Sequence, residues 1–286
     1  MDILLALLAA MCFGAYSVTI RVGQRRVPDV QAGAGATVAI AVCIALGATV
    51  VAAPEPPDVA ELWPFVLVGA AVPGMSTFLF QRAVQEAGAS RPTVVLGTSP
   101  LLSVLIATVL LDEALDAAIL AGTICIVLGT VTLARERARP AHVRLLGLVL
   151  AAVCAVLFAM RDNVVRAVLR DIDVPALHAG AASLVGAAIA VGLYLALRRE
   201  RPRGAARAAL RPMLPAGVAL GCAYLLLVGA YDTGPVTTVA PLAGTQPLWA
   251  VLIAAVVLGR SEAVGIRLVA AAALVVIGGG LIGLSR

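Results

Sequence analysis

Two prolines lie in the middle of long apolar runs, and each is preceded by small polar residues that could bind a solute. The residues concerned are Thr98, Ser99, Pro100, Thr245, Gln246 and Pro247. A proline inside a helix removes the hydrogen bond to the carbonyl four residues earlier and kinks the helix. In a membrane, that carbonyl needs a polar partner or a water-filled cavity. We therefore expect the prolines to act as kinks or gates and the polar side chains to line a central cavity, with Gln246 as the strongest candidate. The alternative is that the hydroxyls bond their own backbone and the prolines only set packing angles.

Five aromatic side chains are candidates for the walls of the same cavity. They are Tyr16, Phe78, Phe158, Tyr224 and Trp249. Tyr16 falls opposite Phe158 when Cys12 is aligned with Cys154. An apolar cavity with a few aromatic walls and convergent polar groups suits an amphipathic small molecule. The alternative is that these rings pack between helices or face lipid.

Four ionisable residues are candidates for ion or charge coupling. They are Arg82, Arg161, Asp162 and His178. Charges deep in lipid are costly and usually functional, and a histidine titrates near neutral pH. The alternatives are that the arginines snorkel to the interface, that Arg161 pairs locally with Asp162, and that His178 is a surface residue at a helix start. Because no predicted span centre offers an unpaired carboxylate, the pattern argues against antiport through a single membrane acid.

The composition places these residues in a membrane protein. Of the 286 residues, 62% are apolar and 13% are charged, and the mean hydropathy is +1.04. Soluble domains are about 45–50% apolar and about 25% charged, so a soluble enzyme, a disordered tail and a nucleic-acid module are excluded. Since a transmembrane helix needs roughly 20 apolar residues, the chain is long enough for ten spans and no soluble domain. The expected spans are Ile3–Val22, Val30–Ala53, Leu62–Val84, Arg91–Leu111, Ala117–Ala134, Leu145–Val165, Pro175–Leu197, Met213–Tyr231, Thr237–Leu258 and Glu262–Leu284.

An internal repeat divides the chain into two halves of five spans. The sequence Gly97-Thr98-Ser99-Pro100-Leu101 recurs 147 residues later as Gly244-Thr245-Gln246-Pro247-Leu248, and Ala32-Gly33-Ala34 recurs at the same offset as Ala179-Gly180-Ala181. We therefore expect one five-helix repeat over residues 1–140 and a second over residues 141–286, together forming one integral membrane domain. Because five is odd, the second repeat must enter the membrane from the opposite side. Such inverted repeats are typical of secondary transporters with a central site between the halves.

The arginines predict the orientation. All 21 basic residues are Arg. Seventeen of the 21 fall at the odd-numbered connections, namely Arg21, Arg25, Arg26, Arg82, Arg91, Arg135, Arg137, Arg139, Arg144, Arg198, Arg199, Arg201, Arg203, Arg207, Arg211, Arg260 and Arg267. By the positive-inside rule, these connections are cytoplasmic and both termini lie outside.

The motifs of both halves resemble a known family. The second half carries Gly234-Pro235-Val236-Thr237-Thr238-Val239-Ala240-Pro241-Leu242 and Gln246-Pro247-Leu248, and the first half carries Ala89-Ser90-Arg91-Pro92, Ser99-Pro100-Leu101 and Leu111-Asp112-Glu113. Over the whole chain this pattern resembles the EamA-type transporters of the drug/metabolite transporter (DMT) superfamily. The resemblance implies a basket of ten helices that moves small organic solutes by alternating access, often outward. It also implies an acid after spans four and nine, here Glu113 and Glu262, which we expect to stabilise helix starts. Many members keep both ends in the cytoplasm, so the orientation predicted from the arginines departs from the resemblance.

These observations predict a secondary active transporter of small organic metabolites or drugs, such as amino-acid-like or amphipathic solutes. We expect it to export them by alternating access, as a multi-pass protein of the cell inner (plasma) membrane. Its expected partners are the solute, the lipid bilayer and a proton or counter-solute, without nucleic acid, cofactor or metal. Enzyme signatures such as H-E-x-x-H and G-x-S-x-G are absent from the sequence. The alternatives are a lipid flippase or scramblase and a non-transporting membrane subunit.

Overall fold

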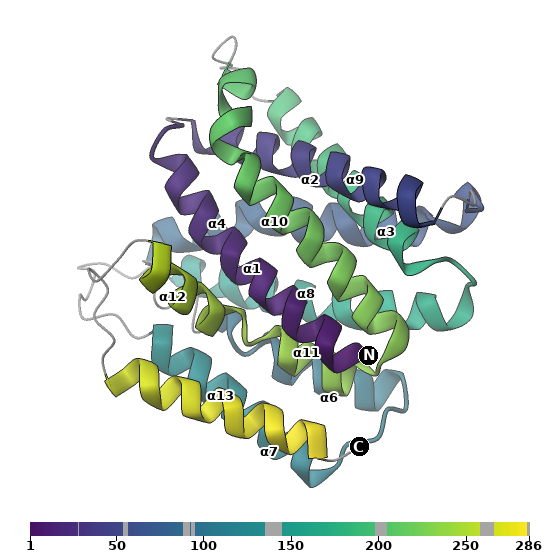
Figure 1. The fold of residues 1–286 in the computed structure, drawn as a ribbon, viewed down its shortest axis with the longest axis vertical. Coiled ribbons are helices and arrows are strands. Elements are labelled where there is room, and N and C mark those ends of the chain that lie inside the picture. The colour runs from purple at the N-terminus through teal and green to yellow at the C-terminus, as the bar shows by residue number, and fades with distance from the viewer. Residues whose placement is uncertain are drawn as a thin grey trace.

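The chain folds into a bundle of helices. The computed structural model describes residues 1–27, 29–53, 57–87, 92, 95–134, 145–197, 205–257 and 266–284, and no strand occurs among them (Figure 1). Within these residues, seven helical segments are long and apolar enough to cross a membrane. Three shorter apolar helices, Ser99–Leu110, Ala117–Thr132 and Ala273–Leu284, bring the crossings to the ten that the sequence predicts.

The first repeat contains α1 (Asp2–Gln24), α2 (Val30–Ala52), the short η1 (Val59–Glu61), the broken crossing α3 (Trp63–Gly69), η2 (Ala70–Met75) and α4 (Ser76–Ala87), then α6 (Ser99–Leu110) and α7 (Ala117–Ala134). The break in the third crossing was not predicted. There, Val72 leaves the helical conformation (φ −138°, ψ 113°) ahead of Pro73, and η2 forms a π-helical segment around it.

The second repeat contains α8 (Leu145–Asp171), α9 (Ala176–Leu197), α10 (Ala205–Thr233), the broken crossing α11 (Val236–Ala243) and α12 (Gln246–Val257), and α13 (Ile266–Leu284). The predicted end of the sixth crossing at Val165 was wrong, because α8 continues to Asp171. Charged side chains ended the apolar run but not the helix. At 1.5 Å per residue, Arg161 lies about 15 Å from that end of α8.

Helix packing follows a two-fold relation between the repeats. Helix α1 packs on α10 and α12, and its counterpart α8 packs in the same way on α4 and α6. Similarly, the contact of α2 with α10 is matched by that of α9 with α3. Helices that correspond to each other also meet directly, as α2 with α9 and α7 with α13, and α6 packs against α11, the first half of the broken ninth crossing. The two five-helix repeats are therefore inverted copies that share one interface.

Small residues bring the paired helices close together. A Cβ at Gly14 of α1 would lie 2.7 Å from the backbone nitrogen of Ala250 and from Cβ of Trp249, both on α12. A Cβ at Gly122 of α7 would lie 2.6 Å from the carbonyl oxygen of Gly278 on α13. Close backbone approach through small residues is a principal source of helix association in lipid, where apolar side chains gain nothing from leaving water.

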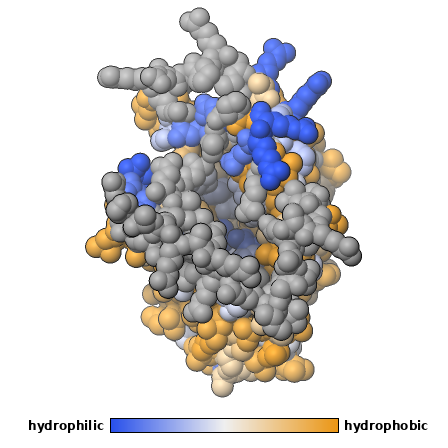
Figure 2. Space-filling model, turned by 90° about the vertical axis from the view of Figure 1, so that its left-hand side faces the viewer, coloured by the Kyte–Doolittle hydropathy of each residue, from blue (hydrophilic) through white to orange (hydrophobic). Residues whose placement is uncertain are grey.

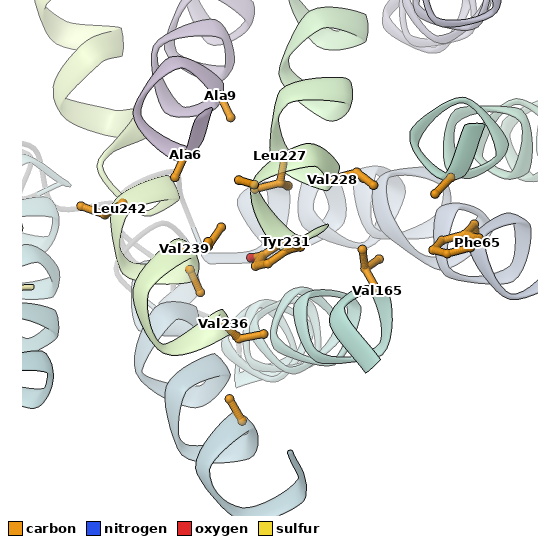
Figure 3. Close-up of a cluster of buried hydrophobic side chains, with 14 of the residues drawn as sticks. Ala6, Ala9, Phe65, Val165, Leu227, Val228, Tyr231, Val236, Val239 and Leu242 are labelled. Atoms are coloured by element: carbon orange, nitrogen blue, oxygen red, sulfur yellow. The ribbon is translucent and has the colours of Figure 1, made fainter. Parts of the chain in front are cut away.

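The two ends of the bundle differ. Near the N-terminus, buried side chains from α1, α8, α10 and α11 form an apolar cluster with Tyr231 at its centre (Figure 3). On the opposite end, at the left of Figure 1, the surface is hollowed near its middle, and hydrophilic atoms lie inside the recess (Figure 2). Among the described residues, the N-terminal end is thus packed with apolar side chains and the other end is recessed.

Candidate functional site

The broken helices of the two repeats meet at their breaks. Turns at residues 97–98 and 244–245 interrupt the fourth and ninth crossings, and a Cβ at Gly244 would lie 2.7 Å from Cγ of Pro100. Each proline is the second residue of the helix that follows its turn. At that position a proline has no hydrogen bond to lose. The crossings are therefore interrupted at these points and not merely kinked.

The two threonines at the breaks satisfy their own turns. Thr98 Oγ1 donates to the Val95 carbonyl and Thr245 Oγ1 donates to the Leu242 carbonyl, both at 2.7 Å. This is the local bonding that the sequence left open as the alternative. Ser99 and Gln246 are half-buried first residues of α6 and α12. Among the hydrogen bonds of the described residues, neither of these two side chains has a partner, unlike the two threonines.

A buried ion pair lies beside α6, the helix that follows the break in the fourth crossing. Arg161 donates to Asp162 Oδ1 from Nε (3.0 Å) and from Nη2 (2.6 Å), and the two side chains are 9% and 7% exposed. Ser103 Oγ of α6 donates to the second carboxylate oxygen of Asp162 (2.7 Å). Both carboxylate oxygens are therefore occupied, as a buried charge pair requires. The pair joins α8 to the half-helix that begins at Ser99.

Aromatic rings surround the guanidinium group. The Cζ atom of Arg161 lies 5.0 Å from the centroid of the Phe158 ring and 5.9 Å from that of Tyr224. Arg161 Nη1 also donates to the Tyr224 hydroxyl at 3.4 Å. Phe13 of α1 meets Tyr224 edge to face, with centroids 5.7 Å apart and planes at 77°. Cation–π contacts stabilise a guanidinium that is removed from water. Phe13, Phe158 and Tyr224 together with Arg161 and Asp162 form what we call the cage, between α1, α8 and α10.

Polar atoms beside the cage lack partners. The Tyr231 hydroxyl and Asn163 Oδ1 are buried, and neither has a hydrogen-bond partner among the described residues. Tyr231 interacts electrostatically with both Asp162 and Arg161. Asn163 Nδ2 donates to the carbonyls of Ser103 (3.1 Å) and Ala159 (2.9 Å). Buried polar atoms are seldom left unpaired, so the cage has spare capacity for a polar group of a solute or for water.

The sequence missed three residues of this site, Phe13, Ser103 and Tyr231. Ser103 lies one turn after Ser99, and Phe13 lies three residues before Tyr16. Residues three or four apart share a face of a helix, so that spacing was an available signal. Tyr231 lies seven residues, two turns, after Tyr224 on α10.

Other predicted site residues lie close to the cage. Tyr16 and Phe78, like Phe13, pack against a cluster of buried side chains from α2, α9 and α10 that includes Tyr224. Phe78 also stacks on Tyr194 of α9, with ring centroids 3.9 Å apart. Trp249 is half-buried on α12, at the crossing with Gly14 of α1. The aromatic candidates therefore come from α1, α4, α8, α10 and α12.

The remaining two ionisable candidates lie elsewhere. Arg82 is 59% exposed and bonds Glu86 of the same helix at 2.6 Å. His178 lies in the first turn of α9 and lines a groove between α2 and α3. Of the four predicted coupling residues, only Arg161 and Asp162 are in the cage. No group of residues suited to hold a metal occurs in the described part of the chain.

A second polar cluster, the outer latch, ties the repeats together at the N-terminal end. Glu113 accepts hydrogen bonds from the backbone of Val236 (2.9 Å) and Thr237 (2.8 Å), at the start of α11. Arg166 Nη1 donates to the Tyr231 carbonyl (2.7 Å) and the Asp232 carbonyl (2.9 Å), and its Nε lies 4.0 Å from Glu113. The expectation that Glu113 stabilises a helix start is confirmed, although that helix belongs to the other repeat. Glu262 lies outside the described residues.

Comparisons with known proteins agree with this architecture. The model of the EamA-like transporter family matches twice, over residues 1–135 and 145–284. No curated protein matches. A solved protein crystal structure superposes with a TM-score of 0.78 at 22% sequence identity, covering 99% of this chain and 96% of that one, which supports the fold. The two family matches and the inverted five-helix repeats make this a multi-pass membrane protein of transporter type, and the chain belongs to the EamA-like transporter family.

Proposed function

We propose that this protein is a secondary active transporter that exports small organic solutes, amino-acid-like or amphipathic, across the cell inner membrane. The solute binds between the repeats and becomes accessible from each side in turn. The partners in this proposal are the solute, the surrounding bilayer and a proton or counter-solute.

The observation that carries the proposal is the cage around Arg161. An ion pair inside a membrane is costly and is usually functional. Arg161 and Asp162 have no net charge together, so the site suits a neutral or zwitterionic solute. A solute carboxylate can take guanidinium donors that Asp162 does not use, and an ammonium group can donate to the lone pair of Asp162 Oδ2 that Ser103 leaves free. The rings of Phe13, Phe158 and Tyr224 supply walls for the apolar part.

The difference between the two ends supports alternating access. The outer latch and the apolar cluster around Tyr231 close the N-terminal end, while the recess in Figure 2 opens on the end where Arg25, Arg26, Arg82, Arg207 and Arg211 are exposed. The positive-inside rule makes that end cytoplasmic. A transporter that rests in this state loads from the cytoplasm, which suits export.

The test is solute flux in proteoliposomes with a charge-neutral pair of substitutions. A panel of labelled amino acids and amphipathic amines is screened with the natural protein, and flux of the accepted solute is then measured in the Arg161→Gln/Asp162→Asn variant. Loss of flux in a folded variant is expected, whereas the control Arg82→Gln/Glu86→Gln should transport normally. Full transport by the Arg161→Gln/Asp162→Asn variant would overturn the assignment of the site. Lipid scrambling without solute flux would favour the flippase.

A further inference from the structure

We propose that the groove formed by α2, η1, α3 and α9 binds one acyl chain of a bilayer phospholipid, with the polar end of the lipid beside His178. The groove has a volume of about 460 Å³ and is lined by Leu46, Thr49, Val59, Leu62, Trp63, Val66, Leu67, His178, Ala181, Ala182 and Val185. This volume falls within the range of ligand pockets, about 300–1,000 Å³. The site is separate from the cage and from solute transport.

The shape of the groove comes from small residues on one helix and large ones on two others. Ala181 and Ala182 of α9 are 4% and 6% exposed and form the floor. Leu46 of α2 and Leu67 of α3 are 46% and 61% exposed and belong to the walls. Because the walls are exposed apolar side chains of membrane-crossing helices, the groove opens towards lipid. An apolar space of this kind does not hold water, so hydrocarbon is the occupant that the bilayer supplies.

Polarity changes along the groove in the same direction as along a lipid. His178 lies in the first turn of α9, and Val185 lies seven residues further into the membrane, about 10 Å at 1.5 Å per residue. Trp63, at the start of α3, is 62% exposed at the same end as His178, where tryptophans mark the membrane interface. Apart from Thr49, Trp63 and His178, the side chains that line the groove are aliphatic. An amphiphile with its polar group at the interface therefore fits this gradient.

The histidine is the polar group of the groove that still needs a partner. Thr49 Oγ1 already donates to the Leu46 carbonyl at 2.7 Å. The His178 ring lines the groove, and because its Nδ1 is buried without a hydrogen-bond partner among the described residues, the rest of the ring edge is what a lipid in the groove can reach. An imidazole carries one donor and one acceptor when neutral, and the ester and phosphate region of a phospholipid lies at this depth. The zwitterionic solute proposed above is a poorer occupant, because eight of the eleven residues that line the groove are aliphatic.

The test uses a phosphatidylethanolamine with a photoreactive diazirine in one acyl chain, reconstituted with the full-length protein in liposomes. After illumination, labelled peptides are mapped by mass spectrometry in the natural protein and in two variants of α9. Val185→Phe fills the inner end of the groove, while the matched control Ile189→Phe places the same ring one turn further on, at a residue that is 58% exposed. Melting temperatures show whether both variants fold.

We expect labels to concentrate on residues 46–49, 62–67 and 181–185 in the natural protein. Val185→Phe should reduce this labelling by about threefold or more, because packing and polar contacts in lipid contribute modest free energies, and Ile189→Phe should not. Labels spread evenly over the lipid-facing helices would overturn the proposal. So would groove labelling that Val185→Phe leaves unchanged, or labelling by diazirine palmitate but not by the phospholipid. If Val185→Phe fails to fold, the distribution of labels on the natural protein tests the proposal alone: labels concentrated in the groove support it, and evenly spread labels overturn it.

Discussion

At the residue scale, Arg161 and Asp162 stabilise the fold only as a pair. Removing one partner of a buried ion pair leaves an uncompensated charge and costs about 3–5 kcal/mol, whereas replacing both is often neutral. We therefore expect Asp162→Asn to lower the free energy of unfolding by several kcal/mol. The Arg161→Gln/Asp162→Asn variant should recover most of that loss. Thermal unfolding of the purified variants measures both effects, and a double variant no more stable than the single one would show that the charges do not couple.

Gln246 allows binding to be separated from folding. It is half-buried at the start of α12, and its side chain makes no hydrogen bond to other described residues. Gln246→Ala should therefore slow solute flux while leaving the melting temperature close to that of the natural protein. Gln24→Ala, at the last residue of α1, is the matched control and should change neither quantity. Unchanged flux in Gln246→Ala would remove this residue from the site.

The sequence predicted the broken helices of the site but not the contacts around the ion pair. The prolines and their polar neighbours were visible because a proline within an apolar run interrupts helical hydrogen bonding and the polar side chains beside it stand out from that run. The contacts across helices were not visible: Ser103 donates to Asp162 and Tyr224 accepts from Arg161, and both come from helices whose packing no local pattern determines. Arg82 resembled Arg161 in sequence, but its bond to Glu86 is a contact within one helix turn. A single sequence does not separate these two environments.

At the element scale, the outer latch depends on one carboxylate that caps a helix of the other repeat. Hydrogen bonds to charged groups contribute about 1.5–3 kcal/mol each, so Glu113→Gln should weaken the closed N-terminal end. We expect a cysteine introduced at Thr238 to react faster with a thiol reagent added from that side. Asp112→Asn is the matched control, since Asn tolerates the positive φ of 51° at this position. Equal rates in the two variants would contradict a role for Glu113 in closure.

The crossing of α1 and α12 depends on the absence of a side chain at Gly14. A Cβ there would come within 2.7 Å of α12, so Gly14→Ala should lower the free energy of unfolding by about 1–3 kcal/mol. A Cβ at Gly192 of α9 would meet no described atom within 4 Å, and Gly192→Ala should be close to neutral. Detergent-solubilised variants compared by thermal unfolding provide the measurement. A stable Gly14→Ala variant would mean that these two helices separate more easily than their contact suggests.

The helices were predictable to within a few residues where apolar runs end at a turn, as for α7, whose predicted and observed bounds agree at Ala117–Ala134. They were not predictable where a polar residue continues a helix. The eighth crossing was expected from Met213, but α10 begins at Ala205 and accommodates Pro212 and Pro215. The third crossing, expected to be continuous, is broken at Val72 and Pro73. Its proline carried the same signal as Pro100 and Pro247.

At the scale of the whole molecule, the repeat in the sequence predicted the two-fold arrangement of the helices. The arginines predict in addition which end faces the cytoplasm. In cells carrying a variant with all native cysteines replaced, an impermeant thiol reagent should label a cysteine at Asp58 and not one at Arg207. Both positions are exposed, so accessibility in the folded protein is not the limiting factor. The reverse pattern would place both termini in the cytoplasm.

The central claim is that one pocket at the crossing of the broken helices opens to each side in turn. In oriented proteoliposomes, single cysteines replacing Ser99 and Gln246, one from each repeat, test it directly. Both should react with an impermeant thiol reagent from the arginine-rich end, and from the N-terminal end only when Glu113→Gln is also present. Cysteines that react from neither side in any of these proteins would contradict a pocket between the repeats.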